Sequence, residues 1–132
     1  MAKQFTLGKQ ERLKSRKTIE QLFSEGKKFM LSPFRVFYLF DEMTYPPLQF
    51  GVGISTKNFK KAVDRNRIKR IIRDSYRLQK LPIQKKLKEK NLRLNLFFIY
   101  TAKELTDYKF IYDKMDLVLQ KLISEVEKQS EK

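Results

Sequence analysis

The sequence contains neither cysteine nor histidine, and each absence excludes a class of function. Without cysteine there are no disulfides and no thiolate metal sites, which is typical of an intracellular protein. The absence of histidine removes the commonest general base. It also excludes catalytic triads of Ser or Cys with His, and imidazole metal ligands. The sequence has no run of about 18 apolar residues, the length that a membrane-spanning helix needs, and its first residues lack the apolar stretch of a signal peptide. We therefore expect a cytoplasmic protein that binds no membrane.

The chain is strongly basic. Thirty Lys and Arg against fifteen Asp and Glu give a formal net charge of +15 in 132 residues, with a pI near 10.0. This excess indicates a polyanionic partner, such as nucleic acid, an acidic membrane surface or an acidic protein. The apolar content of 41% is enough for the core of one domain. We expect a single domain over residues 1–132, with an N-terminal arm at 1–8 and a tail at 129–132.

The hydrophobic pattern predicts an α+β domain with the element order α-β-β-α-β-α. Helical spacing of apolar residues predicts three helices, at 11–29 with Gly26 as a stop, at 60–80 and at 106–128. Stretches rich in β-branched and aromatic residues predict three strands, at 32–40, 48–56 and 92–102. Residues 83–91 could form a short helix or a loop. We expect the first two strands to form an antiparallel hairpin and the last two to pair in parallel, which gives a small mixed sheet in a two-layer domain.

Residues 57–80 form a segment that is both basic and apolar. It holds ten Lys and Arg against two Asp, a net charge of +8 in 24 residues. At 100° per residue, its isoleucines, Ser75, Tyr76, Leu78 and Gln79 fall on one side of a helix, which would dock onto the sheet. The other side would present cations and one amide to solvent: Asn66, Lys69, Arg70, Arg73, Arg77 and Lys80.

The charges on this helix favour binding of a polyanion over an ordinary solvated face. An ordinary solvated helix face carries residues of both charges, which form ion pairs at i, i+4. Here the neighbouring residues have like charges, and a bound anion would relieve their repulsion. Five arginines and one lysine lie between Arg65 and Arg77, and the planar guanidinium group suits phosphate. Asn66 could contact a phosphate or a ribose hydroxyl, or could instead cap the helix.

The stretch KNFKKAVDRNRIKRIIRDSYR resembles the RNR signature of the bacterial ribonuclease P protein component. RLKSRKTIEQLF is similar to the first helix of that family, FGVGIST is similar to the strand that enters the signature, and the resemblance spans roughly residues 5–128. The resemblance implies the protein subunit of a ribonucleoprotein endonuclease that removes the 5′ leader from precursor tRNA. A catalytic RNA with bound Mg²⁺ would perform the hydrolysis, so neither a catalytic residue nor a metal site is expected in this chain.

The resemblance also implies a left-handed β-α-β crossover, against the usual rule, as in the second domain of a small-subunit ribosomal protein. Carried over by position, a cleft between the first helix and the sheet would hold the leader with Ile19, Phe23, Arg35 and Phe37. Many members carry an aromatic where Ile19 stands and a lysine where Thr56 stands. The contacts with the catalytic RNA would come from Lys57, Lys60, Lys61, Arg65, Asn66, Arg67, Lys69, Arg70, Arg73 and Arg77.

Several alternatives stay open at this point. Phe23 and Phe37 could be plain core residues, because aromatics at helical or strand spacing usually are. An autonomous nuclease would need clustered carboxylates for two-metal chemistry, whereas Asp64 and Asp74 are single acids inside a basic helix. A generic RNA- or DNA-binding module, such as a ribosomal protein, could use the same helix. The expected partners are the catalytic RNA and precursor tRNA, and no protein partner is indicated.

Overall fold

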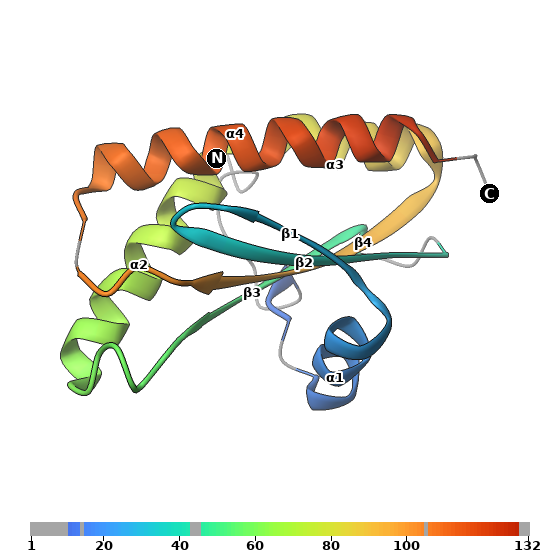
Figure 1. The fold of residues 1–132 in the computed structure, drawn as a ribbon. Helices are drawn as coiled ribbons and strands as arrows, with labels where there is room; N and C mark the ends of the chain where they lie inside the picture. Colours follow the sequence, from blue (N-terminus) through green and yellow to red (C-terminus); the bar gives the residue numbers. More distant parts are fainter. Residues whose placement is uncertain (1–10, 14, 43–45, 105, 130–132) are drawn as a thin grey trace.

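The computed structural model describes residues 11–13, 15–42, 46–104 and 106–129, which form four helices and one four-stranded sheet (Figure 1). The mixed α+β class is confirmed. The predicted arm at 1–8 and most of the predicted tail lie outside the described residues. In chain order the elements are α1 (Arg16–Glu25), β1 (Lys27–Leu31), β2 (Phe34–Glu42), β3 (Leu48–Ile54), α2 (Ala62–Gln79), α3 (Leu81–Lys90), β4 (Leu92–Tyr100) and α4 (Tyr108–Glu127).

Helix α1 is shorter than its hydrophobic spacing predicts. It begins after Ser15, whose hydroxyl accepts a hydrogen bond from the Thr18 amide at 3.3 Å. It ends at Gly26, where the backbone turns extended, so the predicted stop is confirmed. The predicted continuation of the helix to residue 29 is wrong. From Lys27 the chain forms β1 instead, because the extended backbone at Gly26 directs it alongside β2, with which it pairs antiparallel.

The sheet has the order β1-β2-β4-β3, so β4 lies between β2 and β3. The predicted hairpin between residues 32–40 and 48–56 is therefore wrong, since β2 pairs antiparallel with β4 instead. The predicted parallel pairing of β3 with β4 is confirmed. Strand β4 is central because both of its faces are apolar, with Leu96 and Phe98 on one and Phe97 on the other. The hand of the crossover from β3 to β4 stays a prediction.

Helices cover the two faces of the sheet unequally (Figure 1). Helices α2, α3 and α4 pack over the main core on one face. Helix α1 lies against the other face, below the sheet in this view, over a small second core of Leu13, Leu22 and Phe37. Helices packed against a small mixed sheet are thus confirmed, with α1 added on the second face. Among the described helices, none is both long and apolar enough to span a bilayer.

Helix α2 docks through the side that its sequence predicts. Ile68, Ile72 and Tyr76 are fully buried, and the Tyr76 ring stacks on Phe50 of β3 with 3.9 Å between ring centroids. Leu78 departs from the prediction, because 42% of its surface is exposed. The periodicity of the sequence therefore predicts the buried side of this helix through most of its length.

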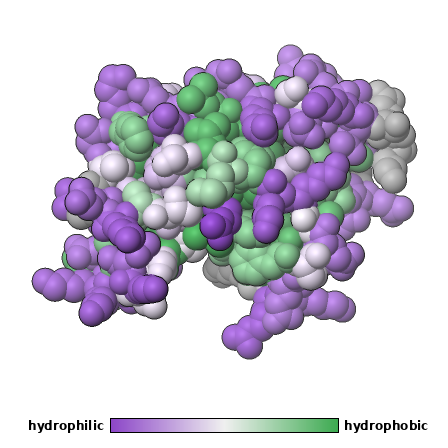
Figure 2. Space-filling model, viewed as in Figure 1, coloured by the Kyte–Doolittle hydropathy of each residue, from purple (hydrophilic) through white to green (hydrophobic). Residues whose placement is uncertain are grey.

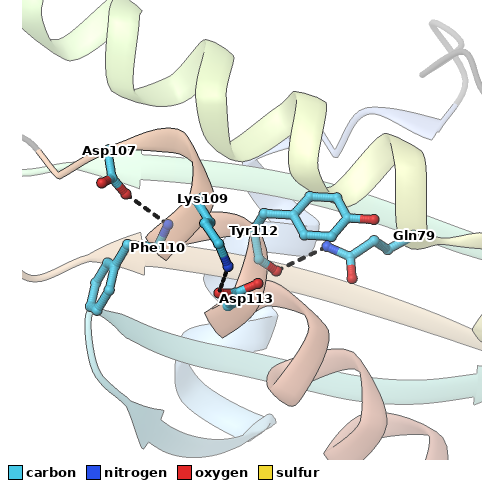
Figure 3. Close-up of polar contacts among 6 residues, drawn as sticks. All are labelled: Gln79, Asp107, Lys109, Phe110, Tyr112 and Asp113. Carbon is cyan, nitrogen blue, oxygen red and sulfur yellow. Dashed lines mark hydrogen bonds and ion pairs between the residues drawn. The ribbon is translucent and has the colours of Figure 1, made fainter.

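Figure 3 shows how the end of α2 is joined to the start of α4. The side-chain amide of Gln79 donates to the Tyr112 carbonyl oxygen at 3.1 Å and to the Ser75 carbonyl oxygen at 3.1 Å. Asp107 caps α4 by accepting a hydrogen bond from the Phe110 amide at 2.8 Å. The two helices are thus joined at one end of α2, while its first turns extend away from α4 at the lower left of Figure 1.

Candidate nucleic-acid interface

The first half of α2 and the loop before it carry a dense set of exposed cations. Figure 2 shows hydrophilic side chains covering this end of the molecule, at the lower left. We call this region the basic surface and define it by its exposed members, Lys57, Lys60, Lys61, Asn66, Arg67 and Arg70. The interpretation of Asn66 as a helix cap is wrong, because α2 begins at Ala62 and places this amide in the second turn.

Arg65 organises the loop of the basic surface. Its Nη1 atom donates to the carbonyl oxygens of Phe59 and Lys60, each at 2.8 Å. Phe59 is 8% exposed and packs near Tyr100, so the loop is held from both sides. One nitrogen of this predicted RNA contact is therefore already used within the protein, and Arg65 fixes the position of the neighbouring lysines.

The remaining predicted cations of α2 lie outside the basic surface. Lys69, Arg73 and Arg77 are half-buried, and Arg77 lies 3.7 Å from the Asp74 carboxylate. Lys80, expected on the solvent side, is 1% exposed, and its ammonium group lies 2.6 Å from the Glu11 carboxylate. The predicted exposure of Lys80 is therefore wrong. A buried ammonium group requires a partner, and here the partner comes from a distant segment of the chain, which local spacing does not reveal.

The predicted leader residues gather on the α1 face of the sheet. The Phe23 ring meets Phe37 edge-on with 4.8 Å between centroids and Phe97 with 5.4 Å. Phe37 is 9% exposed and belongs to the second core, whereas Phe23 is 46% exposed. Arg35 is exposed and alternates onto the same side of β2 as Phe37. Burial therefore favours the core interpretation for Phe37 and leaves Phe23 accessible.

A groove runs between the start of α1 and the edge of the sheet, with a volume of about 290 Å³. We call it the α1 groove. Of the four predicted leader residues, only Ile19 lines it. The others in its lining were not predicted there: Arg12, Leu13, Phe50, Gly51, Val52 and Phe97, together with Arg73, which was assigned to the catalytic RNA. Helical spacing carries no signal for this groove, because its walls come from five separate segments.

Gly51 of β3 makes room for the Phe97 ring beside the α1 groove. A Cβ atom at Gly51 would lie 2.7 Å from the Phe97 Cδ1 atom and 3.3 Å from the Leu13 carbonyl oxygen. At Gly53 the closest approach to the same ring is 3.1 Å. The two glycines in this strand therefore let an aromatic ring lie across the backbone.

Replacing Gly51 with alanine is expected to lower the free energy of unfolding by about 1–3 kcal/mol, because the Phe97 ring must move away from its present packing. Gly53→Ala is the matched control on the same strand and should lower the free energy of unfolding by less than Gly51→Ala does. Urea unfolding followed by circular dichroism measures both. A Gly51→Ala variant as stable as the parent protein would contradict the close packing of Phe97 on β3.

The charged state of Arg73 in the α1 groove is disfavoured by its surroundings. Burial lowers the pKa of Arg73, and the guanidinium group of Arg12 lowers it further. Among the described residues, no ion pair joins either side chain to a carboxylate, and no group of three or more acidic residues is placed to hold a metal ion. The groove is thus lined by two arginines together with apolar residues, as suits a chain of phosphates and bases.

Comparisons with known proteins agree on one family. The family model described as Ribonuclease P matches residues 7–123. A ribonuclease P protein component from Porphyromonas gingivalis is 35% identical over 123 residues, which cover 92% of this chain and 90% of the relative. The ribonuclease P protein component of Nitrosococcus oceani is 40% identical over 75 residues, 57% of this chain and 61% of the relative.

Two solved structures share the fold. The RNase P protein from Thermotoga maritima has a TM-score of 0.63 at 24% identity, covering 84% of this chain and 96% of that one. The RNase P protein of Staphylococcus aureus has a TM-score of 0.63 at 22% identity, with coverage of 85% and 94%. At these identities the likeness shows the fold.

Proposed function

The chain belongs to the family of ribonuclease P protein components, and from this premise we propose that it binds a catalytic RNA and the 5′ leader of precursor tRNA. In this proposal the complex removes the leader by endonucleolytic cleavage, in the cytoplasm, to give the mature 5′ end. The observation that carries the proposal is the separation of two candidate surfaces within the family match. The basic surface lies on the first half of α2 and the loop before it, whereas the α1 groove is lined by residues 12–13, α1, β3 and β4, and α2 contributes Arg73 to it.

The basic surface is suited to the catalytic RNA. Arg67 and Arg70 are exposed on α2 without a carboxylate partner among the described residues. Each can donate two parallel hydrogen bonds to a phosphate group, and the amide of Asn66, next to Arg67 in the chain, can contact a phosphate or a ribose hydroxyl. Binding RNA would also relieve the repulsion between these cations, so that assembly should weaken steeply as salt rises.

The α1 groove is suited to a single strand. Its volume of about 290 Å³ is near the lower end of the usual range for ligand pockets, about 300–1,000 Å³. Phe97 and Ile19 line it, and the exposed Phe23 ring contacts Phe97 at its side. Aromatic rings hold unpaired bases by stacking and tolerate different sequences. A leader of variable sequence fits such a groove better than a folded RNA would.

Hydrolysis is assigned in this proposal to the RNA. Mg²⁺, which the family implies, is expected on the RNA and the substrate, because the residues of this chain do not fit a magnesium site. Magnesium prefers carboxylate oxygens and water, whereas the candidate surfaces consist of cations and apolar side chains. The protein would therefore act by holding both RNAs in position, which lowers the entropic cost of bringing them together.

Cleavage of a 5′-labelled precursor tRNA at low Mg²⁺ tests the proposal. The reactions contain the protein alone, the cognate catalytic RNA alone, and both together. We expect cleavage at the mature 5′ end only when both are present. Cleavage by the protein alone would establish an autonomous nuclease instead. If the protein adds nothing to the RNA, a generic basic binding module becomes the better account.

A further inference from the structure

A short N-terminal segment, residues 11–13, runs along the free edge of β3. The Leu13 amide donates to the Phe50 carbonyl oxygen at 2.9 Å, and Arg12 forms a parallel bridge with Phe50. Leu13 is 5% exposed and belongs to the second core. Because β3 is the last strand of the sheet, this segment crosses from the α1 face to the side where α2 packs.

Glu11 ties this segment to the junction of α2 and α3. Its Oε1 atom accepts hydrogen bonds from the Lys80 ammonium group at 2.6 Å and from the Gln84 side-chain amide at 3.2 Å. Lys80 is almost fully buried, and Glu11 is 20% exposed. A buried ion pair stabilises a fold little more than apolar residues of the same size would. Its clear effect here is on position, since it determines where the neighbouring Arg12 lies.

Arg12 and Arg73 both line the α1 groove. They are 61 positions apart in the chain and come from different sides of β3. Arg12 is exposed and Arg73 is half-buried, and two guanidinium groups that line one groove repel each other unless an anion lies between them. Burial is the main cause of the lowered pKa of Arg73, and the nearby charge of Arg12 lowers it further.

We propose that Arg12 and Arg73 bind one backbone phosphate of a single-stranded RNA in the α1 groove, and that Glu11, held by Lys80 and Gln84, positions Arg12 for this contact. The identity of that RNA as the 5′ leader rests on the proposed function. The phosphate site itself rests on the arrangement of the two arginines. Because Phe97 lines the same groove, one nucleotide can place its phosphate on the arginines and its base against the ring.

The first test measures the affinity of the assembled protein–RNA complex for precursor tRNA with its leader and for mature tRNA without one. Arg12→Ala is expected to weaken binding of the leader-bearing substrate about tenfold and to leave mature tRNA unaffected. The slope of log affinity against log salt should become shallower by about 0.7, the value for one phosphate of a single strand. The affinity of Arg12→Lys for the leader-bearing substrate should lie between those of the parent and of Arg12→Ala, because lysine keeps the charge and loses the planar donor pair.

Lys88→Ala is the matched control. Lys88 is an exposed cation on α3, so its removal changes the net charge equally without touching the groove. It should leave leader-dependent affinity unchanged. If Arg12→Ala and Lys88→Ala have the same effect, or if Arg12→Ala has none, the phosphate site does not exist as proposed.

The positioning role of Glu11 is tested by a double-mutant cycle. Glu11→Gln should reduce leader-dependent affinity, and adding Arg12→Ala to it should cause little further loss, because Arg12 is no longer held in the groove. If Glu11 served only to stabilise the fold, the fold-losses in affinity caused by Glu11→Gln and by Arg12→Ala would multiply in the double variant. Thermal unfolding of each variant confirms that it is folded, and the Arg12 result stands alone should Glu11→Gln unfold.

The same experiment separates this inference from the proposed function. If the parent complex prefers the leader and cleaves it while Arg12→Ala behaves normally, the inference is wrong and the function stands. If the parent complex shows no preference for the leader, the function is wrong. The phosphate site is then judged by binding of a short single-stranded RNA to the protein alone, where Arg12→Ala must still weaken binding for the inference to hold.

Discussion

Replacing Arg67 and Arg70 together with glutamate is expected to weaken assembly with the catalytic RNA on the order of 100-fold or more. Both guanidinium groups are exposed on the basic surface, and each charge-assisted hydrogen bond lost contributes about 1.5–3 kcal/mol. The substitution also reverses the sign of the charges that face the phosphates. Stability should change little, because both side chains lie on the side of α2 away from the core. Filter binding or fluorescence titration across a range of salt concentrations measures the affinity.

The matched control for this double variant is Lys85→Glu with Lys88→Glu. Both lysines are exposed on α3, which Figure 1 places on the opposite side of the view from the start of α2. The net charge changes by the same amount in both double variants. A similar loss of affinity in both would show that RNA binds through overall charge alone, which favours the generic basic module over a defined interface.

Phe37→Ala is expected to lower the free energy of unfolding by about 3–5 kcal/mol, a large part of the roughly 5–15 kcal/mol that stabilises a typical domain. Phe37 is 9% exposed and packs between α1 and the sheet with Leu22 and Leu13. Loss of this ring should loosen α1 and thereby disturb the α1 groove. Reduced leader binding by this variant would follow from its instability and would not identify Phe37 as an RNA contact.

Phe23→Ala provides the contrast. The Phe23 ring is 46% exposed and contacts Phe37 and Phe97 only by its edges. We expect a loss of stability of at most about 1.5 kcal/mol together with weaker binding of leader-bearing precursor tRNA. Thermal unfolding and leader-dependent affinity, measured on both variants, separate the two roles. Equal stability losses in Phe23→Ala and Phe37→Ala would refute the assignment of Phe37 to the core and of Phe23 to the surface.

The sequence predicted well those features that depend on local spacing. The two sides of α2 follow from the period of 3.6 residues, and Ile68, Ile72 and Tyr76 are buried as expected. The stop of α1 at Gly26 follows from the chemistry of one residue. Strand β1 was missed because Lys27–Leu31 is short and its two lysines continue the helical pattern. Its assignment depends on pairing with β2, which no local pattern encodes.

The sequence by itself determined the charge, the α+β class and the identity of the basic helix, because composition and periodicity are properties of neighbouring residues. It also indicated the family, through the resemblance of the RNR stretch to a known signature. Only the tertiary structure decided that β4 lies between β2 and β3, that Phe37 is buried while Phe23 is exposed, and that Lys80 pairs with Glu11. The same is true of Arg12, which lies with Arg73 in one groove. The physical reason is that sheet order and side-chain burial depend on contacts between residues far apart in the chain, and the energies of those contacts exist only once the sheet has formed.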